Sequence, residues 1–237
     1  YFFSSLVNCN TTSLFAIALS GVRFCAALQN IKSFLGKPII SYVIKKAISS
    51  KLFDYVIVST DSLKIKKISE KYGAKVFFKR PPEISNDKAK TQEVIVHSLN
   101  WFKKKKTKFD YVCCIYPTSA LIKSTDLKKS FKLIQNAKWS FVMSAQKYST
   151  QIERSFRLLN KRIVLTNEDK FTKNSQAFQD FYHDAGQFYW GTVKSWYSKN
   201  TISSNKSTIY ELKKYQAIDI NTLDDWKFAE KLYKLNN

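Results

Sequence analysis

The sequence predicts an α/β fold with a mainly parallel sheet and helices on both of its faces. From residue 30 onward, apolar runs of strand length alternate with amphipathic segments of about ten to fifteen residues, which is typical of βαβ units. The runs are apolar at nearly every position, as expected for strands buried on both faces. A chain of 237 residues with 44% hydrophobic content can bury such a core in one domain, or in one domain with an excursion.

The first elements are expected between residues 15 and 79. A buried first strand is predicted around 15–19, and KPIISYVIKKAISSK places its apolar side chains on one helical face, with Pro38 near the start. DYVIVST is then predicted as a strand and SLKIKKISEKYG as a helix. Gly73 is suited to a left-handed cap at the end of that helix. AKVFFK is predicted as a short strand.

The pattern continues after a loop at RPPEISNDKAK, which contains two prolines. TQEVIVHSLNWFKKKK is predicted as a helix with Thr91 as its cap, DYVCCIYP as a strand, DLKKSFKLIQNA as a helix and WSFVMSAQ as a strand. Residues 147–182 break the alternation and are interpreted as an excursion from the sheet, with strand-like FRLL and RIVLT. A strand at DAGQFYWGTV, a short helix at 193–198, an edge strand at IYELK and a helix at 222–235 complete the prediction.

The strong positive charge does not by itself predict a nucleic-acid binder. The chain has 40 basic and 18 acidic residues, a formal net charge of +22, which would ordinarily suggest a polyanionic partner. Arginine, which reads phosphate and guanine with a two-pronged fork, occurs at only five positions, and lysine is spread along the chain from Lys32 onward. We interpret the lysines as a solvated surface and expect neither nucleic acid nor membrane as a partner. A nucleic-acid binder stays open as an alternative, and it predicts salt-sensitive affinity for duplex DNA.

The cysteines predict neither a disulfide framework nor a zinc site. Cys113 and Cys114 are adjacent within an expected strand, where neighbouring side chains point to opposite faces. Cys9 and Cys25 have no nearby paired ligands. We predict buried free thiols, as is usual in a reducing cytoplasm.

Residues 1–29 differ from the rest of the chain, since they carry one charge, Arg23. The apolar stretch within them is about fifteen residues, short of the roughly twenty that a membrane span needs. It also lacks the basic start of a signal peptide. We therefore treat 1–29 as an atypical N-terminal segment and 30–237 as the main domain.

Polar side chains follow several of the expected strands. In an open parallel sheet, ligands bind at the carboxyl ends of the strands, where the strand order reverses. No nucleophilic Cys/His or Ser/His/Asp arrangement accompanies these side chains, so they predict a site that positions phosphates and a metal. The candidates are Ser59, Thr60, Asp61, Arg80, Tyr116, Pro117, Thr118, Ser119, Asp219 and Asn221.

Six segments occur in the order, and at about the spacing, seen in one enzyme family. They are NIKSFLGKPIISY, VSTD, RPPEISNDKAKT, YPTSAL, HDAGQFYWG and DINTLDDW. On these segments, from Asn30 to about Tyr233, the chain resembles the CMP-sugar synthetases of the acylneuraminate cytidylyltransferase family. The combination of YPT with HDAGQFYWG is similar to the branch that acts on pseudaminic acid, whereas the sialic acid branch typically has QPTSPLR.

The resemblance implies a Rossmann-like nucleotide-diphospho-sugar transferase fold and a homodimer formed through the excursion. It also implies a Mg²⁺-dependent transfer of CMP from CTP to the anomeric hydroxyl of pseudaminic acid, a nine-carbon ulosonic acid, giving CMP-pseudaminic acid and pyrophosphate. Such an enzyme is expected in the cytoplasm, where its nucleotide-sugar biosynthesis would serve surface glycosylation.

The roles of single residues follow from their places in the matching motifs. Residues expected to face the nucleotide are Gly21, Arg23, Asn30, Arg80, Ala89 and Thr91. Residues expected to shape the sugar pocket are Tyr116, Thr118, His183, Gln187, Phe188 and Tyr189. Asp219 and Asn221 would hold the metal, and Asp219 and Arg80 would be the catalytic pair.

Several of these residues also have purely structural interpretations. His183 could be a satisfied structural histidine, although its HDAG context favours a functional role. Of Phe188, Tyr189 and Trp190, at least one is expected in the core, because neighbours on a strand alternate faces. Asp61 could be only the cap of the next helix.

Two segments depart from the family pattern. The family typically opens with IPARGGSKRIPRKN, which wraps the triphosphate; here the aligned stretch is IALSGVRFCAALQN, where Gly21 and Asn30 match and Arg23 is the remaining cation. The abrupt return of the pattern at Asn30 suggests a shifted reading frame or sequence error upstream. The family's Asp-x-Asp metal pair appears as Asp219-Ile220-Asn221, which predicts weaker metal binding.

Two alternatives to the pseudaminic acid assignment follow. One keeps the chemistry and changes the sugar to sialic acid or another nonulosonic acid. The other is a catalytically impaired relative with a broken triphosphate loop.

Overall fold

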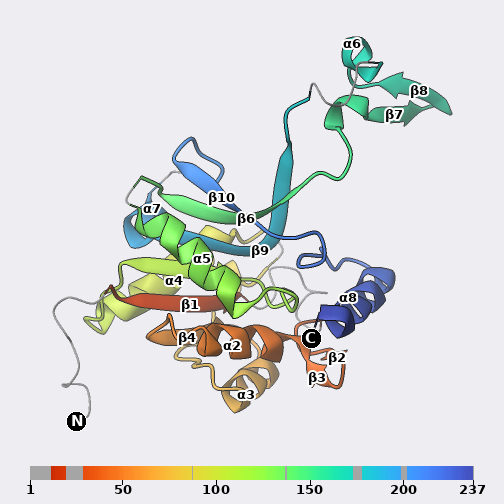
Figure 1. Cartoon of the computed structure of the whole chain (residues 1–237). Helices are drawn as coiled ribbons and strands as arrows, with labels where there is room; N and C mark the ends of the chain where they lie inside the picture. The colour runs from red at the N-terminus through yellow and green to blue at the C-terminus, as the bar shows by residue number, and fades with distance from the viewer. Residues whose placement is uncertain are drawn as a thin grey trace.

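The computed structural model of the chain describes residues 12–19, 29–86, 88–136, 138–172, 178–198 and 202–236. Their centre is a six-stranded sheet in the order β10-β6-β9-β5-β1-β4 (Figure 1). Five of these strands are parallel to one another, and β9 runs antiparallel between β5 and β6. The predicted α/β fold class is therefore confirmed. The bounds are β1 (Leu14–Leu19), β4 (Tyr55–Ser59), β5 (Tyr111–Ile115), β6 (Phe141–Lys147), β9 (Tyr182–Thr192) and β10 (Ser207–Glu211).

Helices cover both faces of this sheet. One apolar cluster joins the sheet to α2 (Ile39–Ser49) and α5 (Ser124–Gln135), and a second joins the opposite face to α4 (Thr91–Lys104) and α7 (Val193–Tyr197). The remaining elements are α3 (Leu63–Lys71), α6 (Glu168–Phe171), α8 (Leu223–Asn236), the 3₁₀ turns Pro82–Ile84 and Ile152–Arg154, and the short strands β2 (Ser33–Phe34), β3 (Lys37–Pro38), β7 (Phe156–Leu159) and β8 (Arg162–Leu165).

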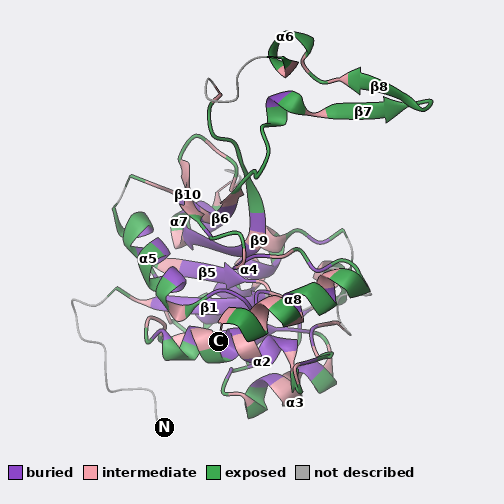
Figure 2. Ribbon diagram, turned by 45° about the vertical axis from the view of Figure 1, so that its right-hand side comes forward, coloured by how far each residue is buried: buried purple, intermediate pink, exposed green. Residues whose placement is uncertain are grey.

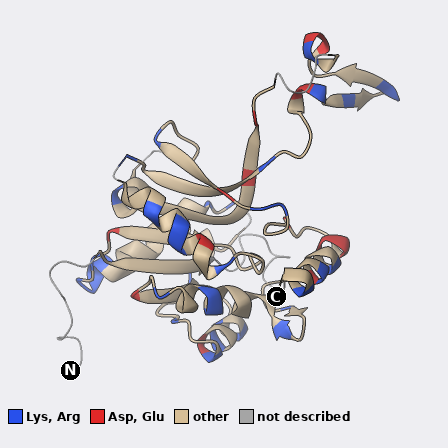
Figure 3. Cartoon of the chain, viewed as in Figure 1, with Lys and Arg blue, Asp and Glu red and all other residues tan. Residues whose placement is uncertain are grey.

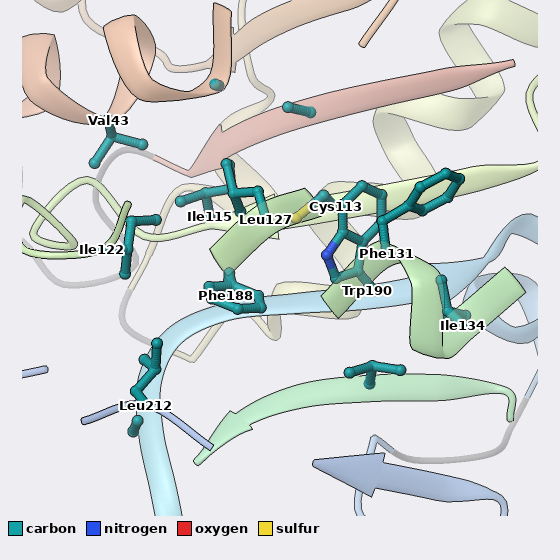
Figure 4. Packing of buried hydrophobic residues seen from close by; sticks show 14 of the residues in the cluster. Val43, Cys113, Ile115, Ile122, Leu127, Phe131, Ile134, Phe188, Trp190 and Leu212 are labelled. Carbon is teal, nitrogen blue, oxygen red and sulfur yellow. The ribbon is translucent and has the colours of Figure 1, made fainter. Parts of the chain in front are cut away.

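Neighbouring residues of a strand serve different faces of the core. Cys113 belongs to the α2–α5 side and Cys114 to the α4–α7 side, and both are buried free thiols, as predicted. In the same way Trp190 packs on the first side and Tyr189 on the second. Figure 4 shows Trp190 packed beside Phe131 within the first cluster, where its Nε1 donates to Ser130 Oγ at 2.9 Å.

Two local predictions were wrong. AKVFFK does not form a strand, because it makes only isolated bridges, at Ile57–Lys75 within β4 and at Thr60–Lys79 just after β4. Between these bridges Phe77 stacks on Trp101, with ring centroids 5.1 Å apart.

The second wrong prediction is Thr91 as a cap. Helix α4 begins at Thr91, and its first turn is closed by Glu93, whose carboxylate accepts from the backbone N–H of Lys90 at 2.8 Å.

Of the other helix-end signals, Gly73 is confirmed and the cap at Asp61 is not. Gly73 has φ +97° after α3, the left-handed conformation that glycine adopts readily. Ser62 rather than Asp61 caps α3, since its Oγ accepts from the N–H of Ile65 at 3.4 Å.

The predicted excursion begins after Lys147 of β6 and ends before Tyr182 of β9, which are still paired in the sheet, and it carries the hairpin β7–β8. Figures 1 and 2 show the hairpin and α6 standing apart from the body, with almost all of the hairpin exposed. The connecting residues Asn160 and Lys161 have φ values of 47° and 64°, as a tight hairpin turn requires. Leu158 and Ile163 are paired across the hairpin, and their side chains are 70% and 62% exposed.

The basic side chains are distributed over many elements, as the sequence predicts. Figure 3 shows lysine and arginine spread over the helices and loops rather than gathered on one element. Among the described residues, no helix is both long and apolar enough to cross a membrane.

Candidate active site

The predicted site segments meet at one edge of the sheet. The chain passes from β1 outward to β4 and then returns to β5 on the other side of β1, so the strand order reverses between β1 and β5. Because β9 is antiparallel, its start lies beside the ends of β5 and β6, with Ala145 opposite Asp184 and Ile115 opposite Phe188. The VSTD, YPT and HDAG segments therefore share the edge where α/β folds bind ligands.

Arg80 is a buried cation at this edge, with only 1% of its surface exposed. Its backbone N–H donates to the carbonyl of Thr60 at 2.9 Å, its Nε donates to Ser85 Oγ at 3.0 Å, and its Nη2 lies 3.8 Å from the Asp61 carboxylate. Burial lowers the pKa of Arg80, and the Asp61 charge partly opposes that shift. These contacts hold the guanidinium in one orientation.

A hydroxyl contact joins Thr91 of the RPPEISNDKAKT segment to Tyr116 of the YPTSAL segment. The Thr91 Oγ1 and the Tyr116 hydroxyl are 2.8 Å apart. The Tyr116 ring meets the Tyr189 ring edge to face, with centroids 5.7 Å apart, and the Tyr189 hydroxyl donates to Asp184 Oδ2 at 2.6 Å. Burial raises the pKa of Tyr116 and of Tyr189. Both hydroxyls therefore stay protonated and able to donate near neutral pH.

A bulge shapes the start of β9. The register against β6 shifts between Met143 and Ala145, and Ser144 Oγ accepts from the N–H groups of Gln187 and Phe188 at 3.1 and 3.0 Å. Gly186 has φ +59°, a conformation that few other residues adopt without strain. The bulge turns successive side chains of the HDAGQFY segment in different directions.

Two of the predicted sugar-pocket side chains point inward. Gln187 is buried, and its Nε2 donates to the carbonyl of Ala185 at 2.7 Å. The backbone carbonyl of Gln187 accepts from the N–H of Tyr116 at 2.9 Å and from Ser119 Oγ at 2.8 Å. Phe188 has no exposed surface and packs in the α2–α5 cluster. The backbone of Gln187 thus fixes the loop after β5, and Phe188 is a core residue.

His183 lies on the stem of the excursion. It is exposed, its ring packs on Tyr148 with centroids 4.9 Å apart, and its Nδ1 is 3.0 Å from the carbonyl oxygen of Asp184.

Three further predicted site residues lie beside the starts of α2 and α4 and in the loop after β5. Asn30 is buried beside the start of α2, where its carbonyl accepts from the N–H of Ile40 at 3.1 Å, and its Nδ2 has no hydrogen-bond partner among the described residues. Ala89 is buried ahead of α4. Thr118, half-buried after β5, accepts from the N–H of Ala120 through its carbonyl at 2.8 Å. Gly21 and Arg23 lie outside the described residues.

The side chains of Asp219 and Asn221 offer oxygen atoms that suit a magnesium ion whose other ligands come from substrate phosphates. Both are exposed, whereas Ile220 between them is buried against Ala120 and Leu121. Since alternate residues of an extended segment point to the same side, their oxygens face away from the core together. No group of three or more His, Cys, Asp or Glu side chains suited to a metal occurs in the described part of the chain. Magnesium is usually held by one or two carboxylates with substrate phosphates.

Comparison with known proteins identifies the family of the chain. A family described as Cytidylyltransferase matches residues 28–236, nearly the whole of the described domain. The chain belongs to the cytidylyltransferase family.

The relatives of this cytidylyltransferase include enzymes of the two sugar branches. It is 36% identical over 211 residues to the pseudaminic acid cytidylyltransferase of Campylobacter jejuni subsp. jejuni serotype O:2, covering 88% of this chain and 90% of that protein. It is 28% identical to N-acylneuraminate cytidylyltransferase A of Danio rerio, covering 86% of this chain and 46% of that longer protein. The predicted family membership is thereby confirmed.

Solved structures confirm the fold of the cytidylyltransferase. CMP:2-keto-3-deoxy-manno-octonic acid synthetase complexed with CTP has a TM-score of 0.66 at 12% identity, covering 96% of this chain and 100% of that one. A 4-diphosphocytidyl-2C-methyl-D-erythritol synthase has a TM-score of 0.69 at 8% identity, covering 94% of this chain and 100% of that one.

Two residues that contact the candidate site residues were not predicted from the sequence. Ser85 accepts a hydrogen bond from the Arg80 guanidinium, and Asp184 accepts one from the Tyr189 hydroxyl. Ser85 lies in the loop motif beside Arg80, and Asp184 stands two residues before Gly186 in HDAG, but sequence spacing alone did not show which way these side chains point.

Proposed function

We propose that this cytidylyltransferase transfers CMP from CTP to the anomeric hydroxyl of pseudaminic acid and releases pyrophosphate. The observation that carries the proposal is the 36% identity to a pseudaminic acid cytidylyltransferase along nearly the full length of both chains. It is supported by a strand-end edge that combines one positioned arginine with hydroxyl groups and exposed carboxylates. Such an edge suits reactants that must be held in line rather than attacked by a protein nucleophile.

Each group of residues in the proposed site has a separate role. Arg80, buried and pre-oriented by Ser85 and Asp61, would bind the nucleotide with a fork that needs no rearrangement. Thr91 and Tyr116 would hold the two reactants beside each other, because one hydroxyl belongs to the nucleotide motif and the other to the sugar motif. Asp219 and Asn221 would hold Mg²⁺, which supplies charge neutralisation at the phosphates when bound.

The reaction that follows is an in-line displacement. The anomeric oxygen of the sugar forms a bond to the α-phosphorus of CTP, and the proton of that hydroxyl passes to solvent. The bond from the phosphorus to the bridging oxygen breaks, and pyrophosphate leaves with the electron pair. The product would serve surface glycosylation, and the proposed location is the cytoplasm.

The decisive experiment is pyrophosphate release from CTP and Mg²⁺ with pseudaminic acid or sialic acid as acceptor. We expect turnover with pseudaminic acid at least about 10-fold above that with sialic acid, and loss of turnover without Mg²⁺. A preference for sialic acid would assign the chain to the sialic acid branch.

A variant chain in which residues 17–30 read IPARGGSKRIPRKN tests the contribution of the triphosphate loop separately. Activity only in that variant chain would show an intact site behind an impaired loop, and silence in both would overturn the proposed activity.

We also propose that a second copy of the chain covers the β7–β8 hairpin. Phe156, Leu158, Ile163 and Leu165 are two cross-strand pairs on one face of the hairpin, and an isolated two-stranded hairpin is at best marginally stable in water. An exposed apolar face of this kind is typical of an interface. The partner face is proposed to be the same hairpin face, as in a symmetric dimer.

The double variant Leu158→Asp with Ile163→Asp is expected to convert the dimer into a folded monomer. Two buried, unpaired carboxylates would oppose association, while the body of the protein does not depend on this hairpin. Sedimentation velocity of both proteins measures the change. Arg157→Gln, on the other face of the hairpin, is the matched control and should remain dimeric. A wild-type chain that sediments as a monomer would contradict the proposal.

A further inference from the structure

Asp184 presents a fixed carboxylate at the mouth of the site. Oδ1 accepts from the N–H of Gly186 at 2.8 Å and Oδ2 accepts from the Tyr189 hydroxyl at 2.6 Å. The left-handed turn at Gly186 makes the first of these bonds possible. An ionised carboxylate has about four lone-pair sites, so each oxygen retains capacity to accept another donor after these two bonds.

The neighbours of Asp184 leave it as the outward-facing polar group of the HDAGQFY segment at this edge. Gln187 and Phe188 are buried, and His183 turns to Tyr148 on the excursion stem. Asp184 is exposed, and its charge acts on both Tyr116 and Tyr189, which places it beside the residues that join the two motifs. No ion pair involving Asp184 occurs within the described ranges.

The charge of this group selects what it can bind. A carboxylate accepts hydrogen bonds and repels phosphate, so its ligand is not the triphosphate of CTP. A sugar acid offers hydroxyl groups and, where it is acylated, amide N–H groups, all of which are donors. A carboxylate held by two donors also loses little rotamer freedom when such a ligand binds.

We propose that Asp184 determines sugar specificity by accepting a hydrogen bond from a hydroxyl or acetamido N–H group of the acceptor sugar. The inference rests on the proposed function and adds to it a specificity-determining residue. Tyr189 is the positioning residue that holds Asp184 Oδ2 in place.

Asp184→Asn tests this role without breaking the bulge. The amide oxygen can still accept from the Gly186 N–H, and the amide nitrogen can donate to the Tyr189 oxygen, so both internal bonds survive while an outward acceptor becomes a donor. We expect the dissociation constant of CMP-pseudaminic acid to rise at least about 10-fold, since a hydrogen bond to a charged group is lost. The dissociation constant of CTP should change by less than about 2-fold. Titration calorimetry measures both without requiring turnover.

Asp180→Asn is the matched control, because it makes the same charge change on the excursion stem, where Asp180 pairs with the exposed Lys147. It should leave both dissociation constants unchanged. Thermal unfolding of each variant shows whether the fold is retained. An equal weakening of CTP and product in Asp184→Asn would indicate a merely structural role and overturn the inference.

The remaining outcomes separate this inference from the proposed function. Wild-type protein that binds CTP but neither pseudaminic acid nor its CMP ester would overturn both. Wild-type protein that binds the product as tightly as Asp184→Asn does would overturn the specificity role alone. A product analogue with a methylated acetamido nitrogen identifies the donor: the effect of Asp184→Asn disappears if that N–H is recognised and persists if a hydroxyl is.

Discussion

Replacing Arg80 with lysine is expected to weaken CTP binding about 100-fold, as hydrogen bonds to a charged group contribute about 1.5–3 kcal/mol each. The guanidinium meets Ser85 through Nε and faces Asp61 through Nη2. A lysine ammonium is a single point charge on a flexible stem and cannot keep both contacts while presenting a planar fork to the nucleotide. Titration calorimetry with CTP measures the loss, and far-ultraviolet circular dichroism checks that the variant is folded.

Lys79→Ala is the control for Arg80→Lys. Lys79 is the exposed neighbour of Arg80, so this variant removes a nearby cation that has no fixed orientation. If it weakens CTP binding as much as Arg80→Lys does, the site attracts CTP by general charge and the positioned guanidinium is not decisive. Near wild-type affinity in Arg80→Lys would contradict the role given to Arg80.

Trp190→Ala is expected to lower the free energy of unfolding by about 3–5 kcal/mol, the range found for large aromatic side chains removed from a core. Trp190 is fully buried, stacks on Phe53 with ring centroids 5.4 Å apart, and lies 5.0 Å from the Phe131 ring. For a chain of this size the unfolding temperature should fall by on the order of 10 °C. Urea unfolding followed by circular dichroism measures the free energy directly.

Trp190→Phe separates packing from hydrogen bonding. It keeps an aromatic ring between Phe53 and Phe131 but removes the donor to Ser130 Oγ, so its cost should be well below that of the alanine variant. A loss under about 1 kcal/mol in Trp190→Ala would mean that the surrounding helices collapse into the space, contrary to the usual stiffness of protein cores.

Much of the fold could be predicted because its signals are local. The strands at the centre of the sheet are apolar at nearly every position, and the helices have one apolar face, so both kinds of element follow from periodicity. AKVFFK looks like a strand by the same rule, yet it lies outside β4 and makes only isolated bridges, because its aromatic residues pack sideways against α4. Thr91 has a favourable residue type for a cap, but its hydroxyl is engaged by Tyr116, a contact distant in sequence.

The site was predictable to the extent that strand ends define it. The rule that ligands bind where parallel strands end selects Tyr116 and the residues around it. Arg80 was selected as the end of AKVFFK, which is not a strand, and it reaches the same edge because its backbone N–H donates to the carbonyl of Thr60 just after β4. The rule cannot say which way a side chain turns within a bulge, and the bulge at Ser144 is what buries Gln187 and leaves Asp184 exposed. Gly21 and Arg23, outside the described residues, stay predictions.

The place of β1 in the sheet has a consequence for how the protein is made. Ala16 of β1 pairs with Val56 of β4 on one side and with Cys113 of β5 on the other. During synthesis at about 5–20 residues per second, the β5 partner leaves the ribosome on the order of ten seconds after β1. Pairings between residues so distant in sequence form slowly. The edge of β1 that later pairs with β5 therefore has no partner strand during that interval. A newly made chain is therefore a candidate for transient protection by chaperones well before its site exists.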